Sequence, residues 1–108
     1  AFWAPERCFR QWGFETKLVF DRKKFDKALD CADAAIVFYH WAGKKGLGAH
    51  FVALEKTDTG IRGYNTYRDS GGPDDWGQSV EEFLKKRGYF GCVFLAIRKK
   101  GGENIEIG

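Results

Sequence analysis

Residues 46–65 constrain the fold of this chain more than any other segment, because they read as two short strands joined by a tight turn. The run at 50–54 is apolar and favours a strand, the residues at 57–60 supply turn chemistry, and 61–65 reads as the return strand. The segment therefore predicts an antiparallel β-hairpin with a histidine, His50, near the start of its first strand.

The predicted pairing of this hairpin brings His50 close to Asn65. If the turn centres near Asp58, the numbers of opposite residues sum to about 115 to 117, so Asn65 falls across from roughly Phe51. An imidazole and a side-chain amide placed in this way can act as a catalytic base and the group that orients it. A glycine-rich stretch at 43–48 predicts a loop that leads into the strand of His50. The alternative is that His50 opens a buried strand and Asn65 closes one, with no chemical role.

The other segments complete an α+β pattern. Helices are predicted where capping residues precede apolar positions on one helical face, at 5–12, 21–31 and 79–87. A short strand is predicted at 14–20. The fold class is α+β, with helices flanking an antiparallel sheet formed by residues 34–41, 50–56, 60–65 and 90–97. A polar, turn-rich stretch at 66–78 predicts a surface loop.

Composition limits the size of the molecule and its partners. The 108 residues make one domain, 1–108, and with 44% hydrophobic residues they can bury a core. The net charge of +3 is small, and basic residues alternate with acidic ones, so no nucleic-acid partner is expected. The longest apolar run is about six residues, far short of a membrane span.

The cysteine and methionine content bears on metal binding, on the redox compartment and on the N-terminus of the chain. The cysteines Cys8, Cys31 and Cys92 lack the spacing of a zinc site or of a disulfide scaffold. We therefore expect no metal and no cofactor, and a reducing, cytoplasmic compartment fits. The sequence contains no methionine. Since translation begins with methionine, its absence predicts that residues ahead of Ala1 have been removed or are not resolved.

A series of segments occurs in an order that matches a known enzyme family. They are the strand and helix GFETKLVFDRKKFDKALD, the strand AAIVFYHW, the strand AHFVAL, the strand end GYN, and the helix SVEEFLKK before a last apolar strand. This series resembles the C-terminal part of a papain-like cysteine peptidase, of the type that includes the bacteriocin-processing, double-glycine-leader peptidases. The resemblance extends over about residues 13–98 and implies a papain-like α+β fold.

The resemblance also implies a mechanism. In this family a cysteine thiolate attacks the carbonyl carbon of the substrate, an imidazole takes and returns the proton, and an Asn or Asp orients the ring. His50 and Asn65 match the last two positions. The family places its nucleophile at the start of a long helix well ahead of the GFETK strand, and no such helix fits here. The chain is therefore expected to be N-terminally truncated, and Cys8 is the candidate nucleophile that remains.

Further residues are secondary candidates. Cys31 and Cys92 read as inert packing residues, at a helix end and in a core strand. His40 is a spare candidate base and Asp69 a spare orienting group.

Trp41 and Trp76 flank the expected cleft in the sequence. Exposed aromatic side chains in such positions could grip a peptide substrate, so both are candidate substrate-binding residues. Partial burial in the core is the alternative.

Three functions remain open from the sequence. The first is the His/Asn-bearing part of a papain-like cysteine peptidase, which acts on a peptide or protein and is inactive without its Cys segment. That segment would pack on an apolar face beside His50 and leave this face exposed when absent. The second is a non-catalytic relative that binds peptides or proteins. The third is a nucleic-acid-binding domain that uses Lys44, Lys45 and residues 98–100, but five scattered cations make this the weakest of the three.

Overall fold

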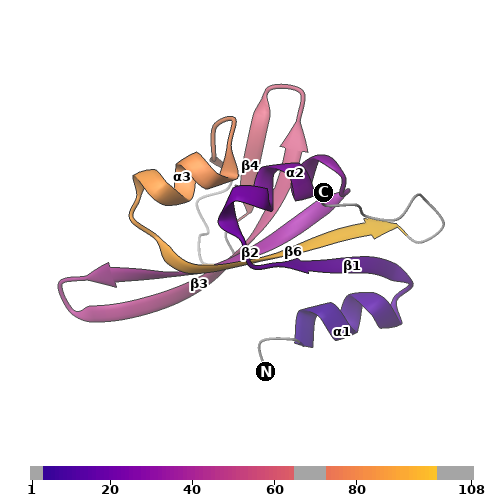
Figure 1. Ribbon diagram of the computed structural model, residues 1–108, viewed down its shortest axis with the longest axis horizontal. Helices are drawn as coiled ribbons and strands as arrows, with labels where there is room; N and C mark the ends of the chain where they lie inside the picture. Colours follow the sequence, from indigo (N-terminus) through magenta and orange to yellow (C-terminus); the bar gives the residue numbers. More distant parts are fainter. Residues whose placement is uncertain (1–3, 65–72, 100–108) are drawn as a thin grey trace.

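The computed structural model describes residues 4–64 and 73–99 (Figure 1). The elements in chain order are α1 (Ala4–Gln11), β1 (Phe14–Val19), the 3-10 turn η1 (Arg22–Lys24), α2 (Phe25–Asp30), β2 (Ala34–Gly43), β3 (Gly46–Thr57), β4 (Gly60–Tyr64), β5 (Asp74–Asp75), α3 (Val80–Lys86) and β6 (Phe90–Lys99).

The strands of the described residues form one antiparallel sheet in the order β1-β6-β2-β3-β4-β5. From β2 to β5, each strand pairs with the next one in the chain. β6, in contrast, inserts between β1 and β2. The predicted α+β class is confirmed, and so is an antiparallel sheet that contains the predicted strands at 34–41, 50–56 and 90–97 and the described part, 60–64, of the strand predicted at 60–65. β1 is added at one edge of this sheet and β5 at the other.

The helices divide the sheet into two faces (Figure 1). α2 and α3 cover one side, here called the helix face, and α1 lies on the other side, here called the α1 face. The core fills the space under α2 and α3, where the rings of Phe25 and Phe94 stack with centroids 4.9 Å apart. Alternate residues of β2 are buried there, namely Ala35, Val37 and Tyr39, as expected for a strand with one covered face.

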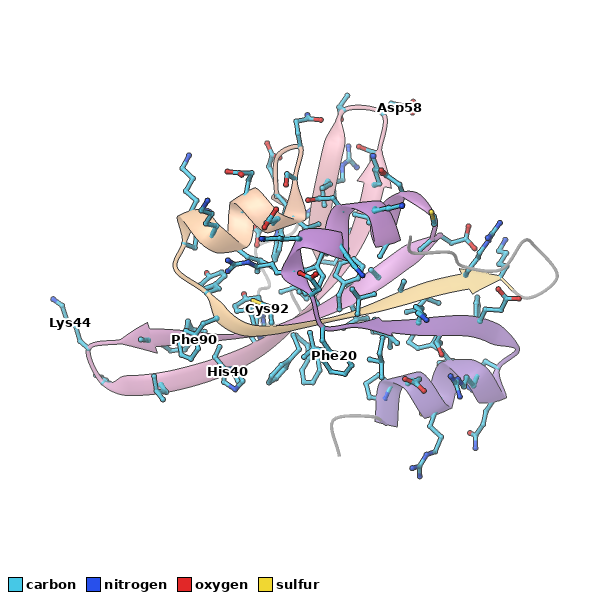
Figure 2. The ribbon with its side chains drawn as sticks, viewed as in Figure 1. Phe20, His40, Lys44, Asp58, Phe90 and Cys92 are labelled. Carbon is cyan, nitrogen blue, oxygen red and sulfur yellow. The ribbon has the colours of Figure 1, made fainter. Side chains whose placement is uncertain are left out.

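The predicted glycine-rich loop at 43–48 is wrong, because these residues extend the two strands into a long β-hairpin. Gly43 pairs with Gly46 across a two-residue turn, Lys44 and Lys45. The backbone of Gly46 has φ of +124°, a conformation that side chains disfavour. The glycines therefore shape the turn of a continuous hairpin, which projects from the body of the molecule as Figures 1 and 2 show.

The α1 face is apolar and only partly covered. Pro5 and Glu6 of α1 lie over its centre, beside Leu18, Ile36 and Leu95. Further along the same face, exposed phenylalanine rings extend toward the hairpin; they are Phe20, Phe51 and Phe90.

An exposed apolar surface was predicted beside His50, but its position differs from that prediction. The exposed rings lie on the α1 face, whereas the side chain of His50 is on the helix face with Tyr39. The reason is the alternation of a strand, which points His50 and Phe51 to opposite sides of the sheet.

Candidate functional site

His50 lies on β3, directly opposite Tyr39 of β2. Their rings meet edge to face, with centroids 6.0 Å apart and an angle of 83° between the planes. The next residues of β3 on the same side, Val52 and Leu54, are buried, whereas His50 is partly exposed. The imidazole therefore sits where the covered core gives way to an accessible surface.

Asn65 and the spare orienting group Asp69 lie outside the described residues. The described part of β4 ends at Tyr64, which is opposite Ala53 of β3. This register agrees with the one predicted from the turn at 57–60. The contact between His50 and Asn65 stays a prediction.

A hollow of about 430 Å³ opens beside Tyr39 on the helix face. We call it the aromatic hollow; its described walls include Tyr39, Asp74, Trp76, Phe83, Arg87 and Tyr89. Tyr39 lines the hollow and also contacts the ring of His50, so the imidazole is one ring away from this space. Its volume falls in the range of roughly 300–1,000 Å³ typical of small-ligand sites.

Two stacked ring pairs build the walls of the aromatic hollow. Tyr39 and Tyr89 stack with centroids 4.2 Å apart, and Trp76 and Phe83 stack at 3.9 Å. The guanidinium carbon of Arg87 lies 3.8 Å from the centre of the Phe83 ring. Stacked rings that contact one another in this way hold fixed positions, so the hollow is preformed.

Tyr39, which lines this space, is a neutral group. Burial raises the pKa of Tyr39 well above its ordinary value of 10.0, and the hydroxyl of Tyr89 raises it further, while the charge of Arg87 lowers it. Tyr39 therefore keeps its proton at neutral pH. It can donate or accept a hydrogen bond there, but it cannot serve as a base.

The structure brings both candidate tryptophans to the same side as His50. Trp41 follows Tyr39 on β2 and is partly exposed, and its ring lies so close to Gly48 that a Cβ there would be 2.2 Å from Cζ2. Trp76 lies on the other side of Tyr39, at a ring distance of 6.3 Å, with 3% of its surface exposed. The exposed ring of Trp41 can contact a ligand directly, whereas the buried ring of Trp76 forms part of the wall of the aromatic hollow.

The structure does not bring Cys8 and His50 together. Cys8 is exposed on α1, which lies on the α1 face, and the His50 side chain is on the helix face. The sheet therefore separates the thiol from the imidazole. Cys31 ends α2, and Cys92 on β6 packs against the core with β2 between its strand and that of His50.

The spare base His40 also lies away from His50. It is on the α1 face of β2, where its ring contacts those of Phe38 and Phe90 at centroid distances of 4.9 and 5.7 Å. Its Nδ1 atom is buried and has no hydrogen-bond partner among the described residues. The two histidines thus occupy opposite faces of the sheet.

Sequence reasoning missed Arg87, Asp74 and the two tyrosines of the hollow. Asp74 stood in a stretch predicted to be a surface loop, and it forms β5 with Asp75. Arg87 is the last residue of the helix predicted at 79–87, and Tyr89 lies two residues beyond it, so the available signal was a charged and an aromatic residue at a helix end. Nothing in the linear order indicated that β5 and the end of α3 would meet beside Tyr39.

The cysteines are expected to differ strongly in reactivity. Burial raises the pKa of the Cys92 thiol above its ordinary value of 9.0, and the thiolate is the reactive form. Brief treatment of the native chain with iodoacetamide at pH 7.5, followed by peptide mass mapping, should modify exposed Cys8 first and Cys92 last. The Cys92 rate should increase as the pH approaches its raised pKa, and unfolding in urea should abolish the difference. A slower reaction of Cys8 in His50→Ala would contradict the separation of the two residues.

Within residues 4–64 and 73–99, no group of three or more His, Cys, Asp or Glu side chains gathers in a way that could hold a metal ion. The helices in these ranges are too short and too polar for any of them to cross a membrane.

Comparisons with known proteins identify no family for this chain. No protein-family model matches the chain, and no curated protein is significantly similar to it in sequence.

Proposed function

We propose that this chain is the His50- and Asn65-bearing part of a papain-like cysteine peptidase. The observation that supports this most is the position of His50, a partly exposed imidazole beside the aromatic hollow. A general base needs access to the reacting atoms and a space next to it that can hold the substrate. The imidazole of His50 is partly exposed, and the hollow that would hold the substrate lies one ring away, beyond Tyr39.

In the proposed reaction, a cysteine thiolate attacks the carbonyl carbon of a peptide bond. His50 takes the thiol proton and gives it to the leaving amine, which leaves a thioester on the cysteine. Water, deprotonated by the same imidazole, then hydrolyses the thioester and restores the thiol. Asn65 has the role of holding the imidazole in the correct tautomer and orientation.

The thiol in this proposal comes from outside the described residues. Cys8 is on the opposite side of the sheet, Cys31 ends α2 ahead of the start of β2, and Cys92 has a pKa raised by burial and packs against the core. For none of the three does the structure show a contact with His50, which a nucleophile needs with its base. The 108-residue chain by itself is therefore expected to have no peptidase activity.

A second candidate function is a peptide-binding domain without catalysis. The exposed ring of Trp41 and the preformed aromatic hollow support it, because both can hold a ligand without any thiol. The two functions differ in what His50 does. A peptidase needs the imidazole for its chemistry, whereas a binding domain needs it, at most, for contact.

An active-site thiol probe tests the first proposal. We would produce the protein from its own gene, treat it with a biotinylated peptidyl vinyl sulfone, and map the modified residue by mass spectrometry. The proposal expects labelling of one cysteine that is lost in His50→Ala and kept in His40→Ala, the matched control on the opposite face. The 108-residue chain should not be labelled under the same conditions. Undiminished labelling in His50→Ala would refute the peptidase proposal and leave the binding domain.

A further inference from the structure

The aromatic hollow is lined by charged residues of both signs, Asp74 and Asp75 on β5 and Arg87 at the end of α3. Asp74 on β5 and Arg87, the residue that ends α3, both line it, and both act on the hydroxyl of Tyr39. Among the described residues, neither side chain takes part in an ion pair, with the other or with any third group. A carboxylate and a guanidinium thus line one small space, and no ion pair within residues 4–64 and 73–99 involves either of them.

Arg87 is positioned to receive an anion. Its guanidinium carbon lies over the Phe83 ring, 3.8 Å from the ring centre, and Phe83 in turn stacks on the buried ring of Trp76. A guanidinium held over a ring in this way can still use its N–H groups to bind a ligand. Those groups match the two oxygens of a carboxylate, which they can bind in a bidentate manner.

Asp74 is positioned to receive a cation. In the β4–β5 ladder it is opposite Gly63, the glycine against which the ring of Trp76 rests on the helix face. The neighbouring Asp75 pairs with Arg62 in the ladder instead, and its Oδ1 accepts a hydrogen bond from the amide of Gly77 at 2.8 Å. Asp74 is therefore the carboxylate that the hollow can offer to a ligand.

We propose that the aromatic hollow binds a small zwitterion, namely an amino acid or a dipeptide with a free ammonium group and a free carboxylate. Arg87 holds the carboxylate and Asp74 holds the ammonium group, and the stacked rings of Tyr39 and Tyr89 form part of the same wall. A ligand with one charge would leave the other protein charge without a partner and would be repelled by it. The volume of about 430 Å³ suits a ligand of this size.

This inference goes beyond the proposed peptidase function and does not depend on it. Binding of a zwitterion requires neither a thiol nor the imidazole of His50. The two proposals can therefore fail separately.

Calorimetric titration of the 108-residue chain with glycyl-phenylalanine tests the inference. The dissociation constant is expected to rise about tenfold or more when the ligand is N-acetylated, and by a similar factor when it is C-amidated, because each change removes one charge-assisted hydrogen bond. Equal binding of the free, acetylated and amidated ligands would overturn the inference, as would the absence of measurable binding of the free dipeptide.

Matched variants assign the two contacts. Arg87→Gln should bind the free and the amidated dipeptide equally, and Asp74→Asn should bind the free and the acetylated dipeptide equally. Lys85→Gln, which removes an exposed charge from the same helix, should keep both preferences. His50→Ala should also keep both, which separates this test from that of the peptidase. If Arg87→Gln or Asp74→Asn kept its preference, the assigned contact would be wrong.

Discussion

Replacing Trp76 with alanine is expected to lower the free energy of unfolding by about 3–5 kcal/mol, the usual cost of removing a large buried aromatic side chain. With 3% of its surface exposed, Trp76 stacks on Phe83 at 3.9 Å and lies 6.3 Å from Tyr39. Its ring also fills the space above Gly63, where a Cβ would come within 2.2 Å of the indole nitrogen. The truncation would leave a cavity that these neighbours cannot close.

Urea unfolding followed by circular dichroism measures the loss. Trp12→Ala is the matched control, because 67% of the Trp12 surface is exposed and its removal should change the free energy by less than about 1 kcal/mol. Trp76→Phe should fall between the two, since a smaller ring keeps part of the stack. Equal effects of Trp76→Ala and Trp12→Ala would show that Trp76 does not support the core.

Replacing Asp26 with alanine is expected to cost about 2–4 kcal/mol, because one carboxylate on α2 holds the start of α3. The side chain of Asp26 accepts hydrogen bonds from Ser79 Oγ at 2.7 Å, from the amide of Val80 at 2.6 Å and from the amide of Glu81 at 3.3 Å. Ser79 is itself the N-cap of α3 and accepts from the amide of Glu82. Loss of the carboxylate leaves these donors without partners between two packed helices.

The same unfolding experiment, with Asp58→Ala as control, measures this effect. Asp58 is exposed at the β3–β4 turn, at the top of Figure 2, so its removal should change stability by less than about 0.5 kcal/mol. Hydrogen exchange offers a second readout. The amides of Val80 and Glu81 should exchange faster in Asp26→Ala, and unchanged exchange there would contradict the proposed link between the helices.

Local features of the fold could be predicted from the sequence because each has a local cause. The alternation of apolar residues in β2 and the turn chemistry at 57–60 gave the strands and the β3–β4 register. Ser79 could be recognised as a cap because its hydroxyl meets the amide of Glu82, three residues later. These contacts involve near neighbours in the chain.

Features that depend on distant residues could not be predicted in this way. The contact of Asp26 with α3 and the pairing of Asp74 with Gly63 depend on how the elements pack. No periodic pattern in the sequence indicates either of them. The glycines at 43–48 misled the prediction for a related reason. Glycine marks a loop in general, but here Gly48 makes room for the ring of Trp41 within a strand. The side of the sheet on which Cys8 would lie was equally hidden, since it depends on where α1 docks.

The place of β6 between β1 and β2 has a consequence for how the molecule folds during synthesis. The strands from β2 to β4 can pair as soon as they leave the ribosome, because each follows the previous one in the chain. β1 is made earlier than all of them, yet within the described sheet it pairs with β6 alone. The segment around β1 must therefore wait, with its backbone groups unpaired, until β6 has been translated. During this interval α1 and β1 are the part of the nascent chain most open to chaperones, to proteases and to pairing with the wrong strand.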